Sequence, residues 1–282
     1  SAMMLEWSDT TDLTYMHADS LWAEEIPFTT YSLIERDSIL VDSVMTAQMP
    51  DTIWRDTTYQ QLRAFHNVRI FRSDMQAVCD SARYHGKDSI LTLFGLPICW
   101  NEDNQLSADQ IDVYIKNQEV DYMHGVGNAI AIKREGIEEF NQLAGKEMFA
   151  YVRDRDIYLV DVQGNAETVF YPQEDDGTYI GVNRTQSSFV KLYLKDRKID
   201  YVLFTTATTG VMIPLDQALE NERKLSGFFW AEEERPHSPE DIFSHPPRTV
   251  RPVAGTVSAA AEDEEEAEED EEENKATRRQ NR

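Results

Sequence analysis

The sequence has no apolar stretch close to the roughly 20 residues that a membrane-spanning helix needs, so we expect no transmembrane helix. It has only two cysteines, Cys79 and Cys99, too few for a disulfide-rich scaffold or a four-cysteine metal site. We interpret them as buried thiols, with a single disulfide as the alternative. Membrane helices and disulfide-dense folds are therefore excluded.

The sequence also lacks a cluster of basic residues, and its net charge is −25. Of its 52 acidic residues, eleven lie in the run 262–273, which leaves 41 against 27 lysines and arginines. Because nucleic-acid binding needs a concentrated basic face, we expect no nucleic-acid partner.

A secretory signal is missing from the N-terminal residues as well. The first three residues resemble a cloning remnant, and acidic residues recur from Glu6 and Asp9 onward, which a signal peptide does not tolerate. We expect residues 1–9 to be a flexible end and any export signal to be absent from this chain.

Proline is sparse until the C-terminal part of the chain, where five of the ten prolines follow residue 235. The apolar patterning stops there too, so the folded part is predicted to end near residue 245. The Pro-rich and acidic residues 246–282 cannot bury enough apolar surface to offset chain entropy, and we interpret them as a disordered, solvated tail.

Apolar and polar residues alternate with a period of two throughout the folded part. The segments "ILTLF", "IDVYI", "MFAYV" and "VKLYL" are rich in β-branched and aromatic residues and are bounded by turn residues. The pattern predicts an all-β protein. Two segments favour helix: residues 137–143, weakly, and residues 215–225, which follow Pro214 and end before Gly227.

One pattern recurs 37 residues apart. Positions 114–129 share Tyr, a polar turn and the triplet Gly-Asn-Ala with positions 151–166, and a partial third copy begins at Tyr193 with Thr206-Ala207-Thr208 in place of that triplet. In each copy a strand enters a polar turn and a second strand returns, as in a β-hairpin. The sequence therefore predicts stacked hairpin repeats.

The first strand of each copy has one fully apolar side. A strand points successive side chains to opposite faces, so stacked copies would present a continuous apolar lining. Its nine residues are Ile111, Val113, Ile115, Met148, Ala150, Val152, Val190, Leu192 and Leu194. From the residues alone, the alternatives are an accessible groove and an ordinary closed core.

Weaker echoes lie upstream, in "ADSL" at 18–21, "CDSA" at 79–82 and "ADQI" at 108–111. Together with "LFGLP", "GNA", "FNQLAGKEMFAYVRD" at 140–154 and "LSGFFWAEEERP" at 225–236, these motifs resemble the OstA-like (LptA-like) family of periplasmic lipopolysaccharide-transport proteins, and most of all its larger Bacteroidetes-type members. The resemblance spans about residues 10–243.

This resemblance implies an elongated, twisted, open β-jelly roll, with residues 10–135 and 136–245 as two continuous β-repeat regions. It implies a non-enzymatic carrier in the periplasm of a Gram-negative cell, whose interior shields the acyl chains of lipopolysaccharide (lipid A). Implied partners are related jelly-roll proteins of the bridge between the membranes, with head-to-tail self-association as one arrangement. An insertion at about 24–58, the missing Gly-Asn at 206–207 and the acidic tail depart from the family's small bridge protein.

A second class of function stays open beside the carrier: an envelope scaffold that docks partner proteins through its strand edges without holding lipid. We find no catalytic motif such as HExxH, GxSxG or CxxC. Asp154 and Asp156 could form a carboxylate pair or bind calcium, but we interpret them as turn residues, and we interpret His124 as a strand-face residue. No cofactor or metal is expected.

Basic residues fall in equivalent turns of neighbouring copies. Arg153, Arg155, Lys195 and Arg197 are candidate rim contacts to the phosphates of a lipid headgroup. The alternative is that these residues are solubilising turn charges, paired with nearby aspartates and individually weak.

Overall fold

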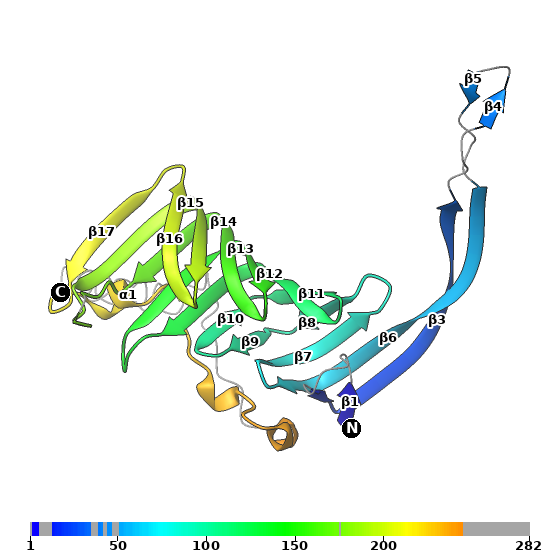
Figure 1. Ribbon diagram of the computed structural model, residues 1–282. Coiled ribbons are helices and arrows are strands. Elements are labelled where there is room, and N and C mark those ends of the chain that lie inside the picture. Colours follow the sequence, from blue (N-terminus) through cyan, green and yellow to red (C-terminus); the bar gives the residue numbers. More distant parts are fainter. Residues whose placement is uncertain are drawn as a thin grey trace, which may run out of the picture.

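The computed structural model describes residues 2–5, 13–34, 39–41, 44–46, 51–174 and 176–244 (Figure 1). The proposed tail at 246–282 lies outside the described residues. The N-terminal stretch 1–9 is described only at Ala2–Leu5, and these residues are not free: they form strand β1, antiparallel to β2.

Most described residues belong to β-strands, as the sequence predicts. The strands are β1 (Ala2–Leu5), β2 (Thr14–His17), β3 (Ser20–Ile34), β4 (Ile39–Val41), β5 (Val44–Thr46), β6 (Asp51–Arg72), β7 (Met75–His85), β8 (Ile90–Phe94), β9 (Ile98–Asn101), β10 (Asn104–Ser107), β11 (Gln110–Lys116), β12 (Glu119–Arg134), β13 (Phe140–Arg153), β14 (Asp156–Phe170), β15 (Gly181–Lys195), β16 (Lys198–Thr205) and β17 (Thr209–Pro214).

Fifteen of these strands form one hydrogen-bonded sheet that is folded into two layers. The long strands β6, β7, β12, β13, β14 and β15 each contribute to both layers. The two halves of β6, β7, β12 and β15 pair with different neighbours. Strands β13 and β14 keep the same neighbours, and register shifts divide their halves. The first layer also contains β3, β8, β11 and β16, and the second also contains β1, β2, β9, β10 and β17. The result is an elongated β structure with an interior between the layers (Figure 1).

Pairs of residues with left-handed backbone conformation bend the long strands β6, β12 and β14. Gly127 and Asn128 have φ of 72° and 46°, Gly164 and Asn165 repeat this 37 residues later, and the strand register shifts beside each pair. Glycine and asparagine adopt this conformation most readily. Thr206 and Ala207 have φ of 66° and 50°, so the bend persists in the third copy without Gly-Asn.

Aspartates of the motifs "ADSL" at 18–21 and "ADQI" at 108–111 form hydrogen bonds with residues at the bends. The backbone N–H of Asp109 donates to the carbonyl of Gly127 at 2.9 Å, and the Asn128 side chain donates to the Asp109 carboxylate at 3.0 Å. Asp19 makes the equivalent contacts with the carbonyl of His66 and the side chain of Asn67. The "ADQI" and "ADSL" motifs thus supply the partners of a bend in the next strand.

The three hairpins predicted from the copies close through two-residue turns. Both residues have positive φ in Asn117-Gln118, Asp154-Arg155 and Asp196-Arg197, which is the type I′ geometry that matches the twist of the flanking strands. In each hairpin the register shifts directly after a tyrosine, at Tyr114, Tyr151 and Tyr193. The hairpin ends of the first layer therefore lie along one border of the interior.

The weak prediction of a helix at residues 137–143 is wrong. Strand β13 begins at Phe140 and pairs with β12 and β14. Within 215–225 a helix is present but short, α1 (Glu220–Arg223). The rest of that segment is turn and irregular structure, and it bonds to the sheet through Gln142.

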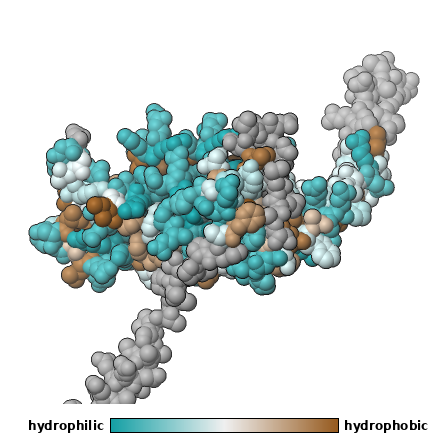
Figure 2. All heavy atoms as spheres, turned by 90° about the horizontal axis from the view of Figure 1, so that it is seen from below, coloured by the Kyte–Doolittle hydropathy of each residue, from teal (hydrophilic) through white to brown (hydrophobic). Residues whose placement is uncertain are grey.

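The C-terminal segment covers the outer face of the second layer. We call residues 215–244 the strap; it includes α1 and two 3₁₀ helices, η1 (Glu232–Glu234) and η2 (Pro239–Phe243) (Figure 1). Leu225 packs with Ile130 and Val182, and Phe229 packs with Ile98 and Trp100. Seen from below, the coloured surface is mostly hydrophilic with scattered apolar groups (Figure 2).

Within the insertion expected at about 24–58, residues 24–34 and 51–58 belong to a two-stranded arm. All fifteen residues of β3 pair with β6, and residues 51–60 of β6 pair with no other strand (Figure 1). Trp22, Tyr31 and Trp54 are exposed on it. The arm thus extends the first layer beyond the body of the protein.

The bend geometry predicts how a methyl group at Gly127 acts. A Cβ there would lie 2.3 Å from the Asp109 carboxylate, at a φ that L-residues rarely adopt. We expect Gly127→Ala to lower the free energy of unfolding by about 2–4 kcal/mol, measured by urea denaturation. Gly177→Ala is the control, because it carries a similar φ with no atom within 4 Å. Equal losses in both variants would contradict the role of the Asp109 contact.

Candidate functional site

An apolar cavity of about 440 Å³ lies between the two layers in the half of the protein formed by β10 and β12–β16. Its walls come from both layers, since Leu106, Ala131 and Leu143 belong to the second and Met148 and Val160 to the first. Short side chains at Ala131 and Ala150 leave room that larger residues would fill. A space of this size and character is typical of small-molecule sites.

The nine residues predicted to line a groove are divided between this cavity and closed core. Five lie on the cavity wall: Met148, Ala150, Val190, Leu192 and Leu194. Val113 and Ile115 border a residual space of about 20 Å³, and Ile111 is fully buried. Val152 faces a more polar cleft of about 480 Å³ between hairpin ends.

The other half of the interior is closed by the protein's own side chains. Met16, Ile70, Leu91, Leu93 and Ile111 are all at most 3% exposed and belong to one packed cluster. These residues come from four different strands, and large side chains from both layers interdigitate there as in an ordinary sandwich core. The interior is therefore a packed core at the β2–β8 end and a cavity at the β12–β16 end.

The two cysteines lie in this interior. Both are buried thiols that form no disulfide, as the sequence predicts, and Cys99 also borders the cavity. Burial removes the thiolate from water and raises the pKa of Cys99 to about 12. The thiol is therefore neutral at physiological pH.

Charged residues surround the mouth of the cavity. Arg197, in the β15–β16 turn, donates to Asp156 at 2.8 Å and pairs with Glu102, in the β9–β10 turn, at 2.5 Å. Asp103 lies beside them on the cavity lining. The hydrogen bond to Asp156 and the charge of Glu102 raise the pKa of Arg197, so its charge is fixed.

The other candidate rim cations have varied surroundings. The Arg153 guanidinium lies 4.3 Å from the centre of the Tyr158 ring, and Arg155 lies 3.9 Å from Glu119. Lys195 is exposed at the β15–β16 turn. Asp154 is exposed at its turn, whereas His124 stacks on Phe149 with ring centres 4.1 Å apart.

Sequence reasoning missed a polar row along the second-layer side of the mouth. It consists of Asn101, Asn104, Lys133, Asn141 and Asn183, all on the cavity lining. Strand register places them together, as Asn104 is opposite Lys133 and Lys133 is opposite Asn141. Their positions in the sequence show no common spacing, so the signal exists only in the pairing of the strands.

Two glutamines attach the strap to the sheet, each through a pair of hydrogen bonds made by its side-chain amide. Gln105 donates to the carbonyl of Phe229 at 2.8 Å and accepts from the N–H of Ala231 at 2.9 Å. Gln142 does the same with Arg223 and Leu225. The two glutamines are 37 residues apart, which is the period of the hairpins, and this spacing is a signal that could have identified them.

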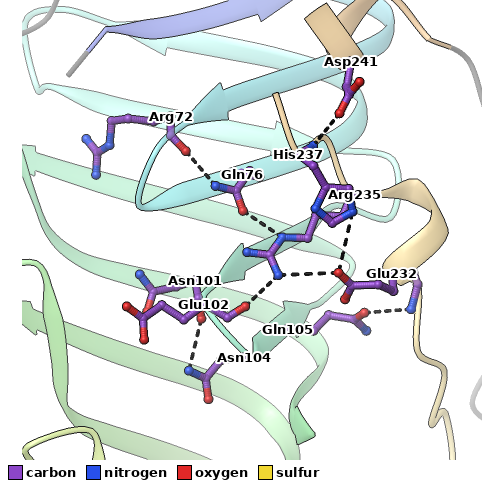
Figure 3. Close-up of polar contacts among 11 residues, drawn as sticks. Arg72, Gln76, Asn101, Glu102, Asn104, Gln105, Glu232, Arg235, His237 and Asp241 are labelled. Carbon is purple, nitrogen blue, oxygen red and sulfur yellow. Dashed lines mark hydrogen bonds and ion pairs between the residues drawn. The ribbon is translucent and has the colours of Figure 1, made fainter. Parts of the chain in front are cut away.

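The strap also fixes the β9–β10 turn at the cavity mouth (Figure 3). Arg235 donates to the Gln76 side chain at 2.9 Å and to the carbonyl of Glu102 at 2.7 Å. Glu232 lies on the other side of Arg235, 3.8 Å away. The backbone of Glu102 is therefore held by the strap while its side chain reaches Arg197.

Searches among known proteins give limited information. No protein-family profile matches the chain, and no curated protein sequence matches it. One solved structure that it resembles is LptH from Pseudomonas aeruginosa, described as the LptA-homologous periplasmic component of the lipopolysaccharide transport device. The two are 13% identical with a TM-score of 0.40, over 50% of this chain and 99% of LptH.

Within the described residues, no group of three or more histidine, cysteine or acidic side chains is placed to hold a metal ion. The described part of the chain also contains no helix with the length and apolar character needed to cross a membrane.

The burial of the cysteines predicts their reactivity. At pH 8 a thiol with a pKa near 12 is almost entirely protonated, and only the thiolate reacts with an aqueous disulfide reagent. We expect both cysteines to react slowly in the folded protein and rapidly in denaturant, and the rate at Cys99 to rise as the pH approaches 12. Lys195→Cys, at an exposed turn, is the control and should react at once. Rapid native reaction of Cys99 at pH 8 would contradict its burial.

Proposed function

We propose that this protein is a non-enzymatic lipid carrier that shields acyl chains in the cavity between its two layers. The single observation that carries the proposal is an apolar cavity of about 440 Å³ that opens at a charged and polar mouth. An acyl chain would fit the apolar interior of the cavity, and its polar headgroup would fit the charged and polar mouth. Each methylene withdrawn from water contributes about 0.8 kcal/mol.

The motifs that resemble the OstA-like family narrow the proposal to lipopolysaccharide, carried through the periplasm of a Gram-negative cell. In this proposal residues 10–245 work as one unit, because the strands of both layers run without a break through β12 and β13. The tail at 246–282 is a separate segment. Partners would be related jelly-roll proteins that add to the end strands, or a second copy of the chain in head-to-tail arrangement.

The five cavity residues named above are the proposed contacts for the acyl chain. Arg197 and Lys195 remain proposed contacts at the rim, although Arg197 already has two carboxylate partners. Arg153 and Arg155 border the more polar cleft and would meet a headgroup only if it extended along the border of the interior. Val113, Ile115 and Ile111 would act in this proposal as closed core rather than as lining.

One observation favours the scaffold alternative. The β3–β6 arm is a two-stranded ribbon with exposed Trp22, Tyr31 and Trp54, and such ribbons are marginally stable without further packing. A partner protein that covers the arm would account for these exposed rings. The scaffold reading needs no lipid, so lipid binding separates the two candidates.

Filling the cavity tests the carrier. We expect Leu192→Trp to weaken the binding of a fluorescent fatty acid by about tenfold or more, because the larger ring occupies the space and adds no polar group. Leu203→Trp is the matched control: Leu203 is on the next strand, outside and 49% exposed. Displacement by intact lipopolysaccharide, compared with its deacylated form, checks the ligand class. Unchanged affinity in Leu192→Trp would place the site elsewhere.

The cavity volume predicts how much lipid is held. With a methylene comparable in volume to a water at about 30 Å³, 440 Å³ accommodates roughly 15 such groups, or one acyl chain. We expect isothermal titration with palmitate to give about one chain bound per protein. A stoichiometry of three or more at similar affinity would contradict the assignment of the bound chain to this cavity alone.

A further inference from the structure

The border between the layers is closed by an ion pair at the cavity mouth. Arg197 belongs to a hairpin end of the first layer and Glu102 to a hairpin end of the second, so their 2.5 Å contact spans the gap between the layers. Asp156, at the start of β14, is the second carboxylate on Arg197. All three residues lie on the cavity lining, so the contact sits across the opening itself.

The two ends of this bridge are anchored unequally. On the second layer, Glu102 follows β9, and its carbonyl is fixed by Arg235 of the strap. On the first layer, Arg197 lies in the turn before β16, a strand that pairs with β15 alone. An edge hairpin has hydrogen-bonded support on one side only, so it is the part of this wall that can move.

Movement of that hairpin would open the cavity. Leu194, Ile199, Val202 and Phe204 lie on the β15–β16 hairpin and form one wall of the space. These side chains are only partly buried, which means that the wall is less firmly packed than the core around Ile111. Holding Arg197 to Glu102 keeps this wall against the second layer.

The bridge is suited to reversible opening. The side chains of Arg197, Glu102 and Asp156 are 60%, 47% and 44% exposed. Ion pairs at this exposure are weak and screened by salt. The contact can therefore break without disturbing either layer, while Asp156 retains Arg197 on its own layer.

We propose that the Glu102–Arg197–Asp156 bridge is a latch that controls lateral passage of an acyl chain into and out of the cavity. The proposal rests on the lipid-carrier function and deepens it by naming what regulates the site. When the latch is closed, the cavity has room for about one chain. When it opens, the β15–β16 hairpin moves away from the β9–β10 turn and a lipid enters from the side, with no need to thread along the interior.

Uptake kinetics test the latch. Binding of a fluorescent fatty acid is followed by stopped flow in the full chain, in 50 mM and in 1 M salt. We expect Glu102→Gln to raise both the association and the dissociation rate about three- to tenfold, with the equilibrium affinity changed less than about twofold. High salt should accelerate the wild type in the same way and leave Glu102→Gln unchanged. Lys198→Gln is the matched control and should behave as wild type, because Lys198 is the exposed residue next to Arg197 and lies outside the cavity lining.

Cross-linking provides the opposite perturbation. A short bismaleimide joining Glu102→Cys to Arg197→Cys should slow uptake at least tenfold, because the hairpin can no longer leave the second layer. The same reagent joining Asn117→Cys to Asp154→Cys links two hairpin ends of one layer and should have no effect. The buried Cys79 and Cys99 do not compete for the reagent.

The outcomes separate the latch from the function on which it rests. Wild-type rates in both Glu102→Gln and the cross-linked protein, with fatty acid bound normally at equilibrium, would overturn the latch and leave the carrier intact. Failure of the wild type to bind fatty acid at equilibrium would overturn both.

Discussion

The bend in the long strands β6, β12 and β14 is the constraint on which the rest of the structure depends. Two successive residues in left-handed conformation turn the strand, and an aspartate of the neighbouring strand holds the turn at Gly127 and at His66. Because these bends lie in β6, β12 and β14 of one hydrogen-bonded sheet, the sheet becomes two layers with an interior between them. Flat strands of the same composition would have neither core nor cavity.

The two layers are completed in different ways. The strap covers the outer face of the second layer. Gln105 and Gln142 of that layer form hydrogen bonds with carbonyl and N–H groups of the strap. The first layer carries stacked aromatic rings outside, such as Tyr114 on Tyr122 at 4.1 Å. A well-supported second layer and an edge hairpin on the first are what make one wall of the cavity movable and the other fixed.

The cavity and the closed core are both lined by strands with the same alternation of apolar and polar residues. The size of the inward side chains and the position of the strand in the sheet decide whether the interior is filled or open. Where Met16, Leu91 and Leu93 meet, the interior is full. Near Ala131 and Ala150, and beside the partly supported β16, room remains for about one acyl chain. Weak, exposed ion pairs then govern access, because strong burial of those charges would cost more than their attraction returns.

The sequence by itself determined the all-β class, the hairpins with their polar turns and the side of each strand that faces inward, because these follow from local alternation and turn chemistry. It also marked the bends at Gly127 and Gly164, although the bend at Thr206-Ala207 needs no special residue type and was not visible. The weak helix at 137–143 failed because pairing with two neighbouring strands overrides local preference. Three features were decided only by the tertiary structure. They are which inward residues border a space, which residues meet across the mouth, and the packing of residues 215–244 on the sheet. Each depends on contacts between residues far apart in the chain, such as Glu102 with Arg197 or Gln105 with Ala231, and local periodicity carries no information on those pairings.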